Sequence, residues 1–231
     1  MSDLIVHEYH YTGGPQTYEY PIGSAVSPEH LNCMSPFVRD AATKNVDALR
    51  DMLVTKWKDI HPVIAPIGSY LLSLKICSVA FTESSGDTNS SWIVFRGANS
   101  SQCLVGSPSK ASDDIMNADW INDIPGLREL LTEFGNLQVG MIPPCSGFFV
   151  GDRLIHQSDD ELCWGQTGKW ENALPMFHDG AGNSICVSTD GAIGIWSPHQ
   201  FQNVAASLAE FVAMFVNRQQ SGQSSQAQWW W

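Results

Sequence analysis

Positive charge is scarce in this chain of 231 residues, which has 12 Lys and Arg against 24 Asp and Glu and a formal net charge of −12. Nucleic acids and anionic membranes are bound through clustered Lys and Arg, so we expect neither as a partner. Charged residues of both signs make up 16% of the chain, against roughly 25% in average soluble domains. The surface must therefore rely on Ser, Thr, Asn and Gln.

Long hydrophobic runs are also lacking. The most apolar stretch, near residues 63–81, is interrupted by Lys75 and by serines, and it is too short to span a bilayer. The opening residues, MSDLIVHE, lack the basic and apolar regions of a secretory signal peptide. We therefore expect a cytoplasmic protein that does not insert into a membrane.

Paired cysteines are missing as well. No Cys-x-x-Cys occurs among the six dispersed cysteines, which are Cys33, Cys77, Cys103, Cys145, Cys163 and Cys186. This spacing argues against a zinc knuckle and a thioredoxin-type redox site. In a cytoplasmic protein the thiols are expected to be reduced and mostly buried.

Hydrophobic residues make up 43% of the chain and include nine Trp and ten Phe, enough for a sizeable core. In the first half, residues 4–23 form two extended runs around a Gly-Gly-Pro turn, which predicts a hairpin. Residues 35–57 predict a helix capped by Ser35, with Val46, Leu49, Leu53 and Trp57 on its buried face. Residues 69–83 and 90–97 are rich in β-forming residues and predict paired strands.

In the second half, residues 119–136 predict a helix with an apolar stripe of Leu127, Leu130, Leu131 and Phe134. Residues 183–189 and 191–197 predict two strands around the turn dipeptide Asp190-Gly191. Residues 203–218 predict a final helix that packs against the sheet through Leu208, Phe211, Val212 and Phe215.

A Ser-rich segment, residues 98–112, is a candidate domain boundary. We predict an α+β N-terminal region of unknown role over 1–111 and a second domain over 112–218. A disordered Gln/Ser-rich tail ending in Trp is predicted for 219–231. The expected fold class is α+β, with a mixed or antiparallel twisted sheet flanked by helices.

The segment 175–199 contains several residue types that carry chemistry, but no pattern that catalysis requires. Its glycines lead into a strand, whereas a phosphate loop leads into a helix. Cys186 lies in mid-strand between apolar residues, where a buried structural thiol is expected. His178, Asp179 and His199 lack the spacing of known metal motifs. We expect a β-hairpin, no catalytic residue, no metal and no cofactor.

Acidic residues are concentrated in 113–182, which has 12 Asp and Glu against 3 Lys and Arg and a net charge of −9. Such a stretch is either a solvated face or a docking surface for a cationic protein. The charge alone leaves both interpretations open.

The order of segments over 113–218 adds a resemblance. A Leu/Phe-rich helix ends at Gly135-Asn136, a Gly-x-Gly-Asn turn enters a strand pair that carries Trp and His, and a Ser-x-x-Glu-Phe helix closes the segment. The residues concerned are Leu127, Phe134, Gly135, Asn136, Gly180, Gly182, Asn183, Gly191, Trp196, His199, Ser207, Glu210 and Phe211. This arrangement resembles the SUKH superfamily, the Smi–Knr-like immunity proteins, and residues 1–111 have no counterpart in it.

The resemblance implies a non-catalytic bacterial immunity protein that binds a cognate toxin, often a nuclease or another effector of contact-dependent or type VI secretion. An acidic face suits a toxin with a basic active-site surface. The residues expected to contact it are Asp113, Asp114, Asp119, Asp159, Asp160, Glu161, Trp164, Trp170 and Glu171. We expect a monomer or weak homodimer. Two alternatives are a scaffold or regulatory adaptor of the same fold and a hydrolase that uses His178 or His199.

Overall fold

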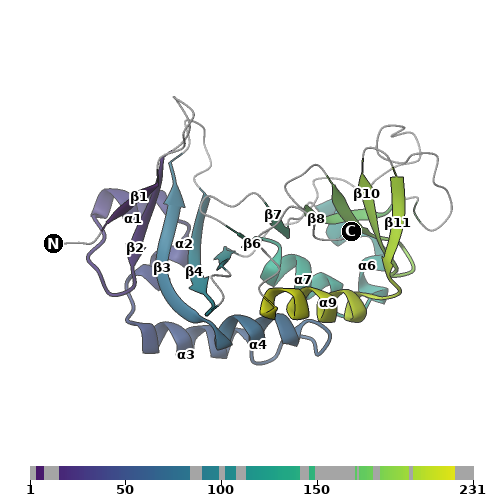
Figure 1. Ribbon diagram of the computed structural model, residues 1–231, viewed down its shortest axis with the longest axis horizontal. Coiled ribbons are helices and arrows are strands. Elements are labelled where there is room, and N and C mark those ends of the chain that lie inside the picture. Colours follow the sequence, from purple (N-terminus) through teal and green to yellow (C-terminus); the bar gives the residue numbers. More distant parts are fainter. Residues whose placement is uncertain are drawn as a thin grey trace.

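The computed structural model describes residues 4–7, 16–83, 90–98, 102–107, 113–140, 146–148, 170, 172–178, 183–197 and 200–221. Within them, eleven strands form an antiparallel sheet in chain order, so that each strand pairs with the next (Figure 1). The strands are β1 Ile5–His7, β2 Thr17–Pro21, β3 Lys75–Thr82, β4 Ser90–Arg96, β5 Gln102–Gly106, β6 Leu137–Val139, β7 Ser146–Phe148, β8 Leu174–His178, β9 Ser184–Val187, β10 Ile193–Ser197 and β11 Gln200–Ala205.

The helices pack along this sheet, which confirms the predicted α+β class with an antiparallel sheet flanked by helices. They are α1 Pro28–Cys33, α2 Pro36–Ala42, α3 Val46–Trp57, α4 Ala65–Ser73, α5 Asp113–Met116, α6 Asp119–Asp123, α7 Leu127–Phe134 and α9 Leu208–Gln220. Among the residues that the structure describes, none of these helices combines the length and apolar character needed to cross a membrane.

The sheet has two wings. Strands β1–β6 form one wing and β8–β11 form the other, and the three-residue strand β7 pairs with both β6 and β8. Figure 1 shows the wings side by side, with α3, α4 and α9 running beneath them. The short strand β7 is therefore the only described strand that links the two wings.

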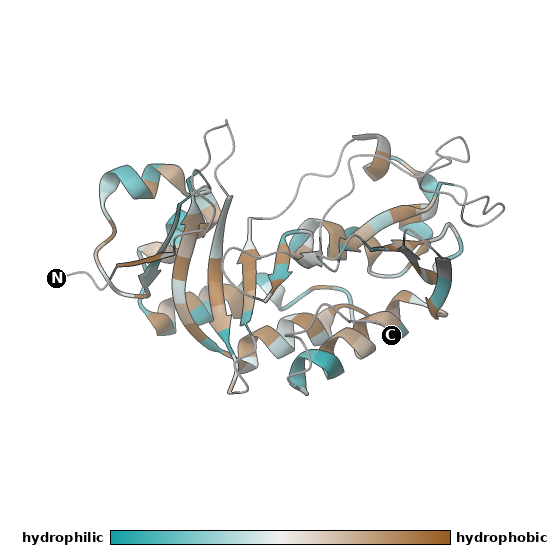
Figure 2. Ribbon diagram, turned by 45° about the horizontal axis from the view of Figure 1, so that its top comes forward, coloured by the Kyte–Doolittle hydropathy of each residue, from teal (hydrophilic) through white to brown (hydrophobic). Residues whose placement is uncertain are grey.

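One face of the first wing forms the main core together with the helices. Alternation along β4 directs Ile93 and Phe95 to this core and Trp92 and Val94 to the opposite face, where they form a small cluster with other buried residues. The long strands at the left of Figure 2 are mainly hydrophobic. Because both faces of β4 are buried, this strand does not show the polar and apolar alternation of a half-exposed strand.

Several elements of the first half were predicted correctly. β1 and β2 form an antiparallel pair, as do β3 and β4, and the Ser35 hydroxyl accepts a hydrogen bond from the backbone of Val38 at the start of α2. The predicted helix 35–57 is wrong at its centre, because the chain leaves the helix at 43–45 and α3 starts again with Asn45 as its cap. Val46 is 38% exposed, so its predicted place on the buried face is also wrong.

The predicted strand 69–83 is wrong in its first part, because residues 69–73 belong to α4. The apolar residues there are buried at helical spacing, with Ile67, Tyr70 and Leu71 on one face. A short apolar run does not by itself distinguish a buried helix from a strand.

In the second half, the predicted helix 119–136 is two helices, since Pro125-Gly126 separates α6 from α7 and Gly126 adopts a φ of +81°. The apolar stripe of α7 is buried as predicted. The final helix begins at Leu208 rather than at 203, because residues 200–205 form β11, and it ends at Gln220, two residues inside the predicted tail. Its predicted face is buried, and Phe215 contacts Phe177 of β8.

The predicted boundary 98–112 contains β5, which pairs with β4 on one side and β6 on the other. Contacts also join α3 to α7 across this boundary. The rings of Trp57 and Phe134 lie 5.5 Å apart, and Lys56 Nζ lies 2.6 Å from Glu133 Oε2. The main core includes residues from both sides. The division into two domains stays a prediction.

Candidate functional site

The segment 175–199 forms β8, β9 and β10, and the predicted pair of strands around Asp190-Gly191 is confirmed. The turn is built by its own polar residues. Asp190 Oδ1 accepts hydrogen bonds from Ser188 Oγ at 2.6 Å and from the Ala192 backbone at 3.2 Å, and Gly191 has a φ of +85°. Asp190 thus closes the turn with one carboxylate oxygen, which explains an aspartate there without catalysis.

Two of the candidate chemical residues of this segment, Cys186 and His178, can be placed in the structure. Cys186 is fully buried in β9, as predicted, and His178 is half-buried in β8. Asp179, Gly180, Gly182 and His199 lie outside the described residues. No set of three or more His, Cys, Asp and Glu within the described residues is arranged to hold a metal ion.

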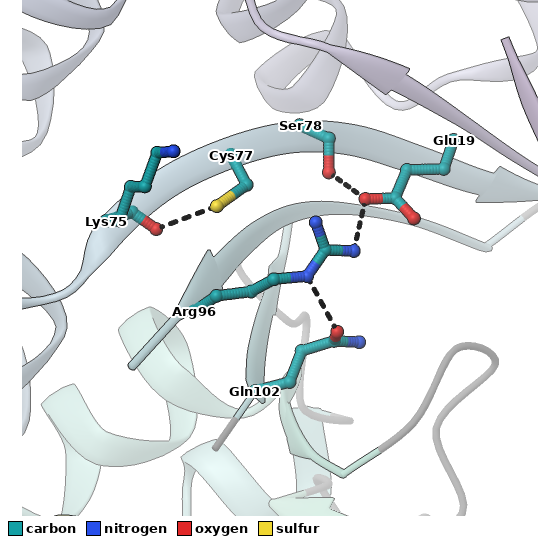
Figure 3. Close-up of polar contacts among 6 residues, drawn as sticks. All are labelled: Glu19, Lys75, Cys77, Ser78, Arg96 and Gln102. Carbon is teal, nitrogen blue, oxygen red and sulfur yellow. Dashed lines mark hydrogen bonds and ion pairs between the residues drawn. The ribbon is translucent and has the colours of Figure 1, made fainter. Parts of the chain in front are cut away.

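A buried carboxylate lies on the first wing, on the sheet face opposite the main core. Glu19 of β2 is 1% exposed, and its Oε1 lies 2.5 Å from Arg96 Nη2 and accepts a hydrogen bond from Ser78 Oγ. Arg96 Nε donates in turn to Gln102 Oε1 at 3.1 Å (Figure 3). The network joins β2, β3, β4 and β5, and none of its residues lines a described cavity. Glu19 is therefore assigned a structural role.

The predicted contact residues are only partly described. Asp119 is exposed on α6. Trp170 is 5% exposed and packs with Ala173, Cys186 and Ala192. Its contact with a partner stays a prediction. Asp113 and Asp114 belong to α5, but their side chains lie outside the described part, as do the residues Asp159, Asp160, Glu161, Trp164 and Glu171.

Asp119 has an acidic neighbour on the same helix face that the sequence did not single out. Asp123 follows it by four residues in α6 and is also exposed, so both carboxylates lie on one side of the helix. Arg128, the nearest basic residue along the chain, is engaged elsewhere, donating to Asn122 Oδ1 at 2.8 Å and to the Met116 carbonyl at 2.6 Å. Neither of these bonds joins Arg128 to the acidic pair.

Asp123 also lines a groove of about 170 Å³, which we call the α6 groove. Its wall is mainly apolar, and it is made by the residues Val63, Asp123, Ile124, Pro125, Asp190, Gly191, Ala206, Ser207, Leu208 and Ala209. The φ of +85° favours glycine at position 191, whereas a Cβ there would make only an ordinary contact with Ile124 Cγ1, at 3.5 Å. Four segments far apart in the chain thus place two carboxylates beside an apolar surface.

The start of α9 forms one side of this groove, and two side chains cap it. Ser207 Oγ accepts a hydrogen bond from the Glu210 backbone at 3.2 Å, and Glu210 Oε2 accepts one from the Ala206 backbone at 2.8 Å. This reciprocal capping box places a carboxylate on the positive end of the helix. The surroundings of the α6 groove are therefore negative, and they favour a cationic ligand.

Comparisons with known proteins found no match: no protein-family model, no curated protein and no solved structure corresponds to this chain. The geometry of the described residues is consequently the basis for a functional proposal.

Proposed function

We propose that this protein is a non-catalytic immunity protein that binds a cognate bacterial toxin with a basic surface and neutralises it in the cytoplasm. The observation that carries the proposal is the α6 groove, where the exposed carboxylates Asp123 and Asp190 border an apolar surface. An apolar contact surrounded by charges of one sign is typical of a protein interface that selects its partner electrostatically. The resemblance of 113–218 to SUKH proteins supports the choice of a toxin as the partner.

The groove supports binding better than catalysis. Of its two carboxylates, Asp190 uses one oxygen to close the β9–β10 turn. Asp123 is exposed on α6 and borders the groove. Within the described residues, no histidine, cysteine or lysine lines the groove beside them. What remains is a negative, partly apolar surface suited to a basic side chain with an aliphatic stem.

The proposal is tested by recovering the partner and by rescue of growth. The tagged full chain is used to isolate bound proteins from its native cells, and each recovered protein is then expressed alone in a host. We expect one stoichiometric partner that arrests growth when expressed alone, and restored growth when this chain is co-expressed. Recovery of partners that do not arrest growth would overturn immunity and favour the adaptor.

A matched pair of variants connects this rescue to the α6 surface. D119N/D123N removes two exposed charges from α6, and D47N/D51N removes two exposed charges at the same spacing from α3. We expect D119N/D123N to require more expressed protein for rescue, whereas D47N/D51N rescues like the unmodified chain. Equal rescue by both variants would exclude the α6 groove as the toxin contact.

A further inference from the structure

A second cavity lies on the first wing, where the start of β4 and the end of β5 meet the beginning of α2 and the turn after α7. It has a volume of about 150 Å³ and is lined by Ser35, Ser90, Ser91, Trp92, Gly106, Ser107 and Asn136. We call it the serine cavity. Among the described residues, its lining shares none with the α6 groove and, in contrast to that groove, includes no charged side chain.

Hydrogen bonds fix the walls of this cavity. Ser91 Oγ accepts from the Ser35 backbone at 2.9 Å and donates to Ser35 Oγ at 3.0 Å, which ties α2 to β4. On the other side, the Gly106 backbone donates to the Asn136 carbonyl at 3.0 Å. Only glycine fits at position 106, because a Cβ there would lie 2.9 Å from Asn136 Cβ. The polar groups of the cavity are thus held in place before any ligand arrives.

Part of this polar lining has no partner. Ser107 Oγ is buried and makes no hydrogen bond, and a buried hydroxyl without a partner destabilises the fold. The Asn136 side chain donates through Nδ2 to the Ser107 carbonyl at 2.8 Å. The Ser90 hydroxyl, on an exposed residue, and the Asn136 side chain line the same cavity. One buried hydroxyl without a partner therefore lies beside further polar groups in one cavity.

The chemistry of the lining restricts the ligand. A charged ligand would lose its hydration without gaining a counter-ion from the described lining, which favours an uncharged ligand. Serine hydroxyls both donate and accept, and they match ligand groups that do the same. The volume corresponds to about five water molecules, at roughly 30 Å³ each, which is more than one bridging water needs. Trp92 and Gly106 add apolar surface, which suits the C–H groups of a sugar ring.

We propose that the serine cavity binds an uncharged monosaccharide. This site is independent of the toxin contact, since it lies on different elements. The ligand hydroxyls give Ser107 Oγ a hydrogen-bond partner and contact Ser90 and Asn136, while the ring packs on the apolar part of the lining. The protein would then bind a small molecule at one site and its proposed protein partner at another.

The test uses saturation-transfer NMR on the full chain with glucose, galactose, mannose and N-acetylglucosamine as probes. Glucuronate serves as the charged counterpart of glucose. We expect transfer to at least one of the neutral sugars, and at least tenfold weaker binding of glucuronate. Ser107→Ala should weaken sugar binding at least fivefold, and Ser73→Ala, which changes an exposed hydroxyl in α4, should leave it unchanged.

The melting temperature of Ser107→Ala without sugar separates a binding role from a structural one. Because Ser107 Oγ has no partner in the fold, its removal should leave the melting temperature equal or raise it. A lowered melting temperature would show that this hydroxyl supports the fold and would overturn its assignment as a ligand group. The proposal would be overturned if none of the four neutral sugars showed saturation transfer, or if glucuronate bound as well as glucose. The cavity would then be interpreted as a site for water molecules.

Discussion

Cys103 is the second residue of β5, its side chain is fully buried, and burial raises the pKa of its thiol to about 12. The unfolded chain releases this proton near pH 9, whereas the folded chain retains it to about pH 12. The stability that comes from the neutral buried thiol is therefore complete below about pH 9 and is lost as the pH rises towards 12.

We predict that the free energy of unfolding falls by about 1.4 kcal/mol per pH unit in this window because of Cys103. Burial also raises the pKa of Tyr18 and Tyr20, so a smaller slope remains in Cys103→Ala. Urea unfolding at several alkaline pH values measures the difference between the two proteins. Cys33→Ala, in which a half-buried thiol is removed, should keep the full slope, and an unchanged slope in Cys103→Ala would contradict the assignment.

Glu19 and Arg96 form a pair in which the carboxylate is buried and the arginine side chain is 40% exposed. Arg96→Met leaves the carboxylate buried without its cation, and we predict a loss of about 2–3 kcal/mol in the free energy of unfolding. This is below the usual range for buried pairs because water partly screens the arginine. Denaturant unfolding of Arg96→Met and of Glu19→Met/Arg96→Met measures it. The double variant should be the more stable of the two, and the reverse order would contradict a structural pair.

The sequence allowed Glu19 to be placed in a strand, but not to be paired. Residues 17–21 alternate in a way that puts Glu19 on the face opposite Tyr18 and Tyr20. Its partner Arg96 lies 77 residues away, and the contact depends on the pairing of β2 with β3 and of β3 with β4. Periodicity reports only the local face of a residue, whereas such pairings are set by the whole sheet.

At the scale of elements, the predictions succeeded where hydrophobic periodicity was strong. The buried stripe of α7 and the buried face of α9 are where the sequence placed them. Errors occurred at interruptions. Asn45 restarts α3 by accepting a hydrogen bond from the Ala48 backbone at 2.9 Å, a signal that Ser/Asn capping rules could have identified. β5 was not predicted, because the Ser, Gly and Pro residues around it are typical of a linker and 98–112 was therefore interpreted as a domain boundary.

β7 is short, but it connects the wings. Gly147 pairs with Gln138 of β6 and His178 of β8, and its φ is +153°. A Cβ at this position would lie 2.5 Å from both Gln138 Cα and the Leu137 carbonyl oxygen, so the backbone itself would have to move.

We predict that Gly147→Ala weakens the β6–β7 pairing and lowers the free energy of unfolding by about 2–4 kcal/mol. Hydrogen exchange should show faster exchange in β6 and β8, while the centres of β3 and β4 stay protected. Gly23→Ala is a useful control, because Gly23 also has a positive φ but a Cβ there meets no atom within 4 Å. Equal destabilisation by the two substitutions would show that backbone strain, and not the contact with β6, is responsible.

At the scale of the whole molecule, two of the acidic residues counted in the sequence, Asp119 and Asp123, lie exposed on α6. Asp119 was expected as a contact residue, and the structure adds Asp123 and Asp190 beside an apolar groove. The sequence could not have identified this groove, because Val63, Ile124 and Leu208 come together only where the segment before α4, the residue after α6 and the start of α9 meet. Charge composition favours a cationic partner, and we propose the α6 groove as the place where it binds.

The most direct test of this account is the association rate of the growth-arresting partner with the full chain, measured at increasing salt concentration. Removal of charges from a contact surface mainly slows association and flattens its salt dependence. We predict that D119N/D123N slows association about tenfold at low salt and shows a shallower salt dependence. D47N/D51N should match the unmodified chain. If the two double variants behave alike, the partner does not bind at the α6 groove, and the central claim is wrong.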